Sequence, residues 1–257
     1  MNKFVVIQYP MKVSSGFISL LFCLLLCLGM VRGFGQAPYR VAPVQTGFTM
    51  GIGGLVLGGA LLYKASIDPL SSAQIMEIKT RGVNGFDALF AGGNYHKGYH
   101  QASEVLKITN LVPLVFYALP AYRSQYGTLN IMAVESFVLT AAVTQVNKVL
   151  VKRPRPYVNQ DQPIYNPTES DARLSFFSGH TSSVASTSFL LAKTIIDVQG
   201  IESRAKKGWI YTGAALVPAT MAALRMAAGK HFMTDVLTGY LVGVGVGLLV
   251  PRLHTER

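Results

Sequence analysis

Apolar residues gather in six long segments beyond residue 46, and each segment is close to the length of a membrane-spanning helix. About 20 helical residues cross the roughly 30 Å of hydrocarbon in a bilayer, where only helices and closed barrels satisfy the backbone polar groups. Some of the segments are short enough to be re-entrant instead. The pattern predicts an all-α fold, a polytopic membrane helical bundle with about six transmembrane helices. The segments are 47–63, 104–122, 130–150, 182–198, 208–224 and 235–250.

The first 37 residues have the order of a targeting segment. Lys3 and Lys12 precede the apolar stretch 17–31, and small residues follow within 33–37. A basic region, a short apolar region and a small-residue exit are typical of a secretory signal peptide, and the apolar stretch is short for a span. We expect a cleaved signal peptide, and the alternative is a retained N-terminal membrane anchor.

Residues 64–103 interleave charged and apolar side chains, which predicts an amphipathic helix lying on the membrane surface. Two of the expected spans carry glycines at helical spacing, which would let neighbouring helices approach closely in lipid. These glycines are Gly54 and Gly58 in the first span and Gly239, Gly243 and Gly247 in the last.

Composition and charge narrow the class of protein. Half of the residues are hydrophobic and 14% are charged, whereas a soluble domain carries about a quarter charged residues. The net charge of +11 comes from scattered Lys and Arg, not from a basic run, so we exclude nucleic acid as a partner. Cys23 and Cys27 lie in one apolar run and provide neither a disulfide framework nor a thiolate metal site. These features predict a membrane protein with an anionic ligand.

The first polar cluster lies at the end of the segment 130–150, where Lys148 is followed by Arg153-Pro154-Arg155-Pro156. The interval from Lys148 to Arg155 is nearly two helical turns, so both would face one way if the helix continued. The prolines favour an end of the helix there, which leaves the Arg155 guanidinium free to bind phosphate oxygens in a fork. Basic residues that anchor the end of a span are the alternative.

The second cluster precedes the segment 182–198. Ser178 or Thr181 could cap a helix there, and the amide groups and positive dipole of a helix N-terminus bind phosphate well. Gly179 would let the backbone approach the ligand, and His180 adds a titratable group. A capping turn with an incidental histidine explains this cluster equally well.

The third cluster contains Arg225, His231 and Asp235. His231 and Asp235 are one helical turn apart, so the carboxylate could hold one imidazole nitrogen and leave the other aimed at an electrophile. A structural hydrogen bond is the alternative, but an ionisable pair at a membrane helix end favours function. If the segments 182–198 and 208–224 form a hairpin, the second and third clusters share one side of the membrane.

Together the three clusters resemble the signature of the type 2 phosphatidic acid phosphatases, also called lipid phosphate phosphatases: Lys-x6-Arg-Pro, Pro-Ser-Gly-His and Ser-Arg-x5-His-x3-Asp. Phe177 replaces the family proline and Leu224 replaces the family serine, whereas every charged and histidine position is kept. The resemblance covers about residues 104–250. The matching residues are Lys148 and Arg155-Pro156, then Ser178-Gly179-His180, then Arg225, His231 and Asp235.

The resemblance implies a membrane-bound lipid phosphatase that forms a phosphohistidine. His231 would attack phosphorus, Asp235 would orient it, and His180 would protonate the leaving alcohol and then activate water. Histidine suits both roles because its ordinary pKa of about 6.5 lies near working pH. The phosphate-binding residues would be Lys148, Arg155, Ser178, Gly179 and Arg225.

No cluster of Asp and Glu accompanies these residues in the sequence, so we expect no metal and no cofactor. Fixed cations and amide groups can stabilise the charge of the transition state instead. His96 and His100 have the spacing of a zinc pair, but without a convincing third ligand we interpret them as polar residues of an interfacial helix.

With this resemblance, we divide the chain into four parts. Residues 1–37 are a signal peptide or N-terminal membrane anchor, and residues 38–103 are a first membrane segment with an amphipathic interfacial region. Residues 104–250 are the phosphatase core, and residues 251–257 are a polar tail.

The basic residues expected opposite the site favour an outward-facing site, because positive loops stay in the cytoplasm. We expect an integral protein of a bacterial inner membrane whose site faces the periplasm. Six spans in this orientation require residues 36–46 to begin inside, whereas a cleaved signal peptide would leave them outside, so these two expectations conflict. The basic residues are Arg123, Arg204, Lys206, Lys207, Arg252 and Arg257.

The expected partners are the bilayer and a phosphorylated lipid substrate. Phosphatidic acid, phosphatidylglycerol phosphate, a polyprenyl diphosphate and the phosphates of lipid A all stay open. Vanadium haloperoxidases share the motifs but are typically larger and soluble, and a phospholipid-binding or transport protein would need only the cations. The sequence does not indicate an oligomeric state.

Overall fold

The computed structural model describes residues 37–91 and 95–255, so residues 1–36 of the expected signal peptide or anchor lie outside it. The described part is helical, and its β structure is one isolated antiparallel bridge between Tyr39 and Thr255. The predicted all-α class is therefore confirmed. The longer helices are α2 (Pro43–Ala65), α3 (Ser72–Arg81), α5 (Lys97–Leu106), α7 (Tyr126–Val151), α8 (Gly179–Val198), α9 (Arg204–Ala227) and α10 (Met233–Leu253). The shorter ones are α4 (Gly85–Ala88), α6 (Val112–Phe116), η1 (Lys107–Leu111), η2 (Pro120–Gln125), η3 (Pro156–Asn159) and η4 (Ser170–Arg173).

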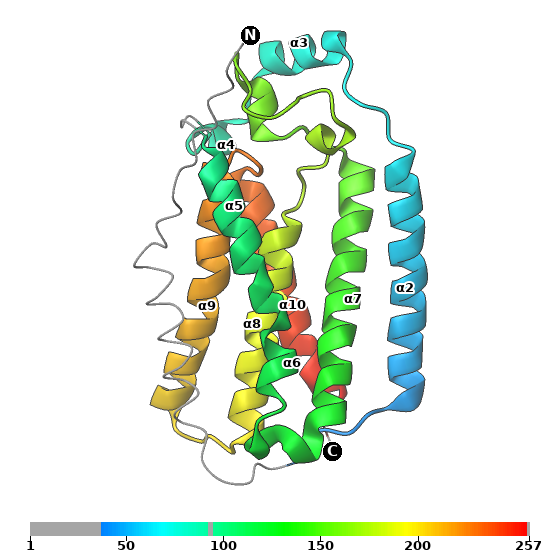
Figure 1. Ribbon diagram of the computed structural model, residues 1–257, viewed down its shortest axis with the longest axis vertical. Coiled ribbons are helices and arrows are strands. Elements are labelled where there is room, and N and C mark those ends of the chain that lie inside the picture. Colours follow the sequence, from blue (N-terminus) through cyan, green and yellow to red (C-terminus); the bar gives the residue numbers. More distant parts are fainter. Residues whose placement is uncertain (1–36, 92–94, 256–257) are drawn as a thin grey trace, which may run out of the picture. The chain divides into compact units, whose positions relative to one another are not determined.

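The helices α2, α7, α8, α9 and α10 run side by side (Figure 1). α8 packs against α7, α9 and α10, and α2 packs against α7. We call one end of this bundle the site end: there α7 and α9 finish, at Val151 and Ala227, and α8 and α10 begin, at Gly179 and Met233. The chain order therefore brings the loop after α7 and the loop after α9 to the same end, as the expected α8–α9 hairpin requires.

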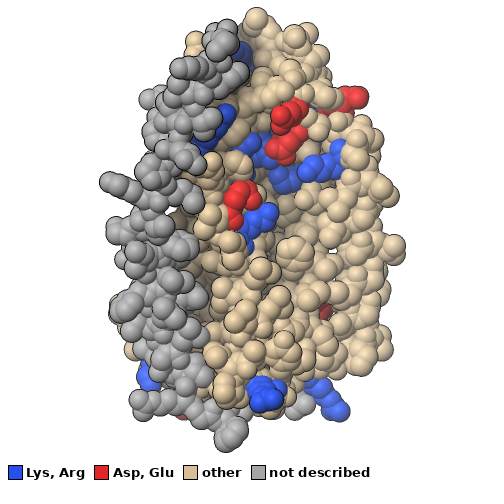
Figure 2. Space-filling model, in the orientation of Figure 1, with Lys and Arg blue, Asp and Glu red and all other residues tan. Residues whose placement is uncertain are grey.

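Four described helical stretches are long and apolar enough to cross a membrane: α2, α7 with its flanking turns, α9 and α10. Their outer faces expose large apolar side chains, such as Leu62, Leu150 and Trp209, as expected for surface in contact with lipid. Figure 2 shows a broad zone with little charge on one face, between charged side chains toward the upper end and Lys or Arg side chains at the lower end. The prediction of a membrane helical bundle is confirmed.

α8 contains the expected segment 182–198 and is as long as a span, but its hydroxyl side chains make it more polar than the four stretches above. Those side chains bond to α7: Ser186 Oγ lies 2.6 Å from Ser136 Oγ, and Ser182 Oγ lies 3.1 Å from Thr144 Oγ1. Hydrogen bonds between membrane helices contribute about 0.6 kcal/mol each on average. α8 is thus polar because it lies between other helices and not because it faces water.

The glycine prediction is confirmed for α10 and wrong for α2. A Cβ on Gly239, Gly243 or Gly247 would collide with backbone carbonyl oxygens of α8 and its N-cap, so these glycines allow the two backbones to approach closely. A Cβ on Gly54 or Gly58 would meet nothing within 4 Å. Both of these glycines point away from the neighbouring helix, and the close contact of α2 with α7 lies elsewhere.

The expected span 104–122 is not one helix. α5 is followed by η1 and α6, and prolines lie at the start of α6 and η2, where a missing N–H is tolerated but an uninterrupted helix is not. In Figure 1 these short helices follow one another from the neighbourhood of α4 down to the opposite end. Together with α2, α7, α8, α9 and α10, they make six passes along the bundle within the described residues.

The region 64–103 contains the helices α3 and α4 before α5. α3 begins with a capping box in which Ser71 and Gln74 exchange side chain to backbone hydrogen bonds, and Figure 1 shows it lying across the site end. Met76 in α3 and Leu89 after α4 are exposed apolar residues, which suits a position at the lipid–water boundary.

At the opposite end, the C-terminal residues pack against the bundle. α10 continues through Leu253, and the buried ring of His254 contacts Glu135 of α7 at 2.7 Å. The backbone N–H of Arg40 donates to the His254 carbonyl at 2.8 Å. The residues just before α2 and the residues His254 and Thr255 of the predicted polar tail therefore lie together, at the end remote from the site end.

Candidate active site

Lys148 lies in the last turn of α7 and is buried. The helix ends three residues later because Lys152 adopts a left-handed conformation, with φ of 48°, and Pro154 cannot continue it. The Lys148 ammonium donates to the carbonyl of Leu174 at 2.7 Å. Its charge is therefore held at the site end, beneath the loop that leads to α8.

Arg155 joins the two loops of the site end. Nη1 donates to the Lys230 carbonyl at 2.7 Å and lies 3.2 Å from Nε2 of His231. Nε and Nη2 donate to the backbone and side chain of Asp171, each at 2.9 Å. Burial raises the pKa of Asp171, but the charge and hydrogen bond of Arg155 outweigh this effect and hold that pKa below its ordinary value. Asp171 and Arg155 are thus a charged pair.

Ser178 is the N-cap of α8, and its hydroxyl accepts a hydrogen bond from the Thr181 amide at 3.4 Å. Its own amide donates to the Asp235 carbonyl at 3.0 Å, which fixes the start of α8 against the start of α10. A Cβ on Gly179 would lie 3.1 Å from Thr144 and 3.8 Å from Lys148. The expected helix N-terminus therefore lies beside the expected phosphate-binding lysine.

His231 lies in the loop between α9 and α10, and it is buried. The loop turns at Gly229, which has φ of 67° and whose Cβ position is filled by the ring of Tyr95. The Lys230 amide returns to the Arg225 carbonyl at 3.1 Å, which closes the end of α9. Burial, and next the positive charge of Arg155, lower the pKa of His231 well below its ordinary value, so the ring is neutral at pH 7.

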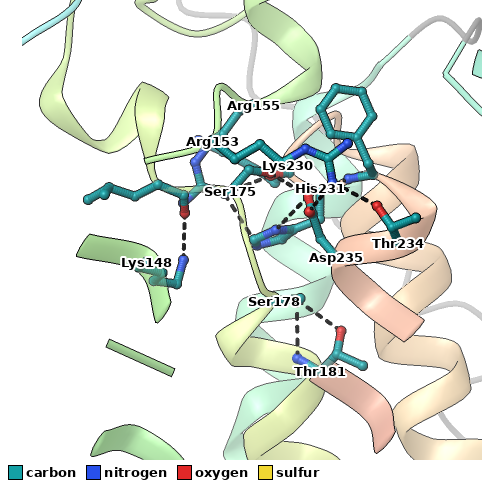
Figure 3. Close-up of polar contacts among 12 residues, drawn as sticks. Lys148, Arg153, Arg155, Ser175, Ser178, Thr181, Lys230, His231, Thr234 and Asp235 are labelled. Atoms are coloured by element: carbon teal, nitrogen blue, oxygen red, sulfur yellow. Dashed lines mark hydrogen bonds and ion pairs between the residues drawn. The ribbon is translucent and has the colours of Figure 1, made fainter. Parts of the chain in front are cut away.

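The carboxylate of Asp235 lies close to the His231 ring but does not hydrogen-bond to it. Oδ2 is 3.7 Å from Nδ1, longer than a hydrogen bond, and Nδ1 has no hydrogen-bond partner among the described residues. The carboxylate instead accepts hydrogen bonds from Arg153, from the Ser175 hydroxyl and from the Phe232 amide. Figure 3 shows His231 between Arg155 and Asp235.

Sequence reasoning placed Arg153 in the first polar cluster without giving it a role, and it missed Asp87; Arg153 bonds to both Asp235 and Asp87. Arg153 Nη1 donates to Asp235 at 2.6 Å, and Nη2 donates to Asp87. Asp87 is fully buried and accepts from the amide and the hydroxyl of Thr234, at 2.9 and 2.8 Å. No spacing pattern marks Asp87, because it reaches the site from the separate region before α5.

His180 and Arg225 form a second group with residues of α5. His180 Nε2 lies 2.6 Å from Oε1 of Glu104. Arg225 is buried and donates to the Ser103 hydroxyl at 2.9 Å, and it lies 3.0 Å from Nδ1 of His100 and 3.6 Å from Glu104. Glu104 was not expected from the sequence, since nothing before residue 148 belongs to the three motifs.

The two histidines that have zinc spacing are engaged in other contacts. Nδ1 of His96 accepts the amide of Gly98 at 3.0 Å and caps α5, and Nδ1 of His100 faces Arg225. Across the residues that the structure describes, no group of three or more His, Cys, Asp or Glu side chains is arranged to hold a metal ion.

The structure thus places the expected site residues of all three motifs at one end of a membrane helical bundle. Among curated proteins, none matches the chain. The family model of the PAP2 superfamily matches residues 130–257, which include all three motifs. The chain belongs to this superfamily, the type 2 phosphatidic acid phosphatases, and it is a lipid phosphatase.

One solved structure is similar to this chain at 21% sequence identity, over 92% of this chain and 94% of the other, with a TM-score of 0.42. It is described as the crystal structure of the first transmembrane PAP2 type phosphatidylglycerolphosphate phosphatase from Bacillus subtilis. The family assignment rests on the family model.

Proposed function

We propose that this lipid phosphatase hydrolyses a phosphate monoester or diphosphate through a phosphohistidine on His231, without a metal ion, at the extracytoplasmic surface of the membrane. The observation that carries this proposal is the buried contact between Arg155 and Nε2 of His231 at 3.2 Å. The Arg155 guanidinium lies next to the neutral His231 imidazole, so a phosphoryl group bound to Arg155 would also lie beside Nε2 of His231.

In the first step, the lone pair of His231 Nε2 attacks phosphorus, and the bond from phosphorus to the lipid oxygen breaks. A neutral ring is needed for this attack, and the lowered pKa of His231 keeps its lone pair available at neutral pH. Charge develops on the Nδ1–H side of the ring, where the Asp235 carboxylate lies 3.7 Å away and stabilises it. His180 donates a proton to the leaving oxygen.

In the second step, water attacks the phosphohistidine and His180 takes up the proton of that water. The bond between phosphorus and Nε2 then breaks, and inorganic phosphate leaves the neutral His231. Lys148, Arg155 and Arg225 bind the phosphoryl oxygens in both steps, together with the start of α8 at Ser178 and Gly179. Because these groups are fixed by hydrogen bonds, they stabilise the transition-state charge with little reorganisation.

The distribution of basic residues supports the orientation. Arg123 in η2, Arg204 at the start of α9 and Arg252 near the end of α10 lie at the end remote from the site end, and positive segments stay in the cytoplasm. Residues 38–42 lie at that same end, next to His254. An outward-facing site therefore places them inside, so this orientation and a cleaved signal peptide exclude one another. The proposed location is a bacterial inner membrane, with the site facing the periplasm.

The proposal is tested by phosphate release from the purified protein in detergent with a chelator present, across the four candidate lipids. We expect release from at least one lipid, and loss of release in His231→Ala with the fold retained. His96→Asn is a matched control, because asparagine also caps a helix and His96 lies outside the proposed machinery. Strong metal dependence, or unchanged release in His231→Ala, would contradict the mechanism.

The intermediate itself can be trapped. A substrate with radiolabelled phosphorus and a leaving group that needs no proton should label the His180→Ala variant, because this variant lacks the base for the second step. The label should be stable in alkali and lost in acid, as expected for phosphohistidine, and absent in His180→Ala/His231→Ala. Acid-stable label would indicate a different nucleophile.

A further inference from the structure

Glu104 brings a carboxylate into a site built for anions. It projects from the last turns of α5, its side chain is 43% exposed, and Oε1 lies 2.6 Å from Nε2 of His180. An ionised carboxylate can only accept hydrogen bonds, so Nε2 of His180 carries the proton of this bond. Nδ1 is then the ring nitrogen that can exchange a proton with a substrate.

Cationic and titratable groups surround His180 on several elements. Arg225 on α9, Lys107 on η1, Lys148 on α7 and His231 in the loop before α10 all act on His180 through their charge. His100, on α5, lies 3.7 Å from Glu104. Positive neighbours disfavour the protonated imidazolium, yet a general acid must carry its proton when the substrate binds.

Glu104 supplies the opposing charge. The Glu104 carboxylate also lies 3.6 Å from Arg225 and 3.9 Å from Lys107. It therefore contacts both His180 and two of the cations that favour loss of the His180 proton. A carboxylate bonded to one imidazole nitrogen fixes the tautomer and stabilises the imidazolium, as in other histidine–carboxylate pairs.

We propose that Glu104 is a positioning residue that orients His180 and keeps it protonated for departure of the lipid alcohol. This inference rests on the proposed function. In the first step the Nδ1 proton passes to the leaving oxygen, and in the second step Nδ1 takes a proton from the attacking water. The Nε2–H···Oε1 bond to Glu104 persists through both steps, so the carboxylate itself gains and loses no proton.

The exposed carboxylate would also repel an anionic phosphate. Removing its charge should therefore weaken proton donation while leaving substrate affinity equal or stronger. A residue that only supports the fold would not separate these two effects. The combination of weaker proton donation and undiminished substrate affinity distinguishes Glu104 from Arg225, since removal of Arg225 would weaken substrate binding.

The test is the pH dependence of kcat, measured at saturating lipid phosphate in detergent, for Glu104→Gln and Glu104→Asp. The alkaline limb reports loss of the proton from the general acid. An opposite charge in contact shifts such a titration by about 1 to 3 pH units, so Glu104→Gln should move the limb down by about 1 unit or more. Glu104→Asp keeps the negative charge, so its alkaline limb should lie at the wild-type pH. Glu77→Gln, an exposed substitution on α3, should not change the pH of the limb.

A second measurement uses a substrate whose leaving group needs no proton, such as a nitrophenyl phosphate. The loss of kcat/KM in Glu104→Gln should be smaller for this substrate than for a lipid phosphate, with KM unchanged or lower. If the wild type is active but the limb does not move, or if both substrates lose activity equally, the role of Glu104 is overturned while the phosphatase mechanism stands. Absence of wild-type phosphate release would instead overturn the proposed function.

Discussion

Arg153 donates a hydrogen bond of 2.6 Å to the carboxylate of Asp235. The same guanidinium donates to Asp87 and lies 4.3 Å from the centre of the Phe232 ring, so its position is fixed from three sides. Asp235 is fully buried, and burying a carboxylate is costly unless it is paired and hydrogen-bonded. The geometry of the His231 loop therefore depends on residues that lie outside the family signature.

Replacing Asp87 should lower activity although Asp87 lies outside the proposed machinery. Asp87→Ala leaves Arg153 and Thr234 without their shared acceptor, which allows Asp235 to shift. A displacement of about 1 Å at a reacting group costs on the order of 100-fold in rate, and we expect a loss of roughly this size in kcat. Phosphate release measured at saturating lipid checks this.

The matched control is Asp161→Asn, because Asp161 is exposed and its salt bridge to Lys79 is 3.8 Å long. It should retain full activity. Equal activities of the Asp87→Ala and Asp161→Asn variants would show that the buried ion pair does not position Asp235.

Gly243→Ala should disrupt the contact between α8 and α10. The new methyl group would collide with the Ser182 carbonyl and would lie 2.7 Å from the Cβ of Ala185. Overpacking of this kind costs about 1–3 kcal/mol, and it would move the N-terminus of α8 relative to His231. Thermal unfolding in detergent should show a lower midpoint, together with reduced phosphate release.

Gly245→Ala is the comparison on the same helix, since its Cβ would meet nothing within 4 Å. Alanine also favours the helix over glycine by about 1 kcal/mol, so its midpoint should be equal or higher. A similar loss in both variants would contradict the close approach of α10 to α8.

Lys230 should make phosphate binding sensitive to pH near 8. Burial, and next the charge of Arg155, lower the pKa of Lys230 from 10.5 to about 8. The ammonium is therefore mostly charged at pH 7 and mostly neutral at pH 9, and affinity for an anion should fall as pH rises between these values. Competitive inhibition by inorganic phosphate across this range measures the effect.

Lys230→Arg is the matched variant, because arginine stays charged throughout this range. Both proteins experience the same titration of the phosphate itself. The inhibition constant should therefore rise more steeply with pH in the wild type than in the variant, and parallel curves would rule out a contribution of Lys230.

The pair of Glu135 and His254 should stabilise the end remote from the site. Both side chains are buried and lie 2.7 Å apart, and removal of one partner of a buried pair costs about 3–5 kcal/mol. Glu135→Ala and His254→Ala should each lower the unfolding midpoint, with the double variant less destabilised than the sum of the two. Strict additivity would indicate that the two residues do not interact.

Much of the fold follows from the apolar pattern because lipid restricts a chain to a few structures. Long apolar segments predicted α2, α7, α8, α9 and α10, and α2, α7, α9 and α10 expose large apolar side chains on their outer faces. The break at Pro113 and Pro120 was missed because a run of apolar residues shows length without showing whether the run is one continuous helix. The polarity of α8 is also explained only by its neighbours, since Ser182 and Ser186 satisfy their hydroxyls on α7.

The sequence by itself determined which residues we propose to carry the chemistry: Lys148, Arg155, His180, Arg225 and His231 are recognisable because their order and spacing match the family signature. The tertiary structure alone decided what surrounds them. Asp87 and Glu104 come from segments with no motif of their own, and they meet Arg153 and His180 at distances in sequence of 66 and 76 residues. Contacts between distant segments depend on how helices pack, and charge pairing acts through space, so no local pattern of residues could have revealed them.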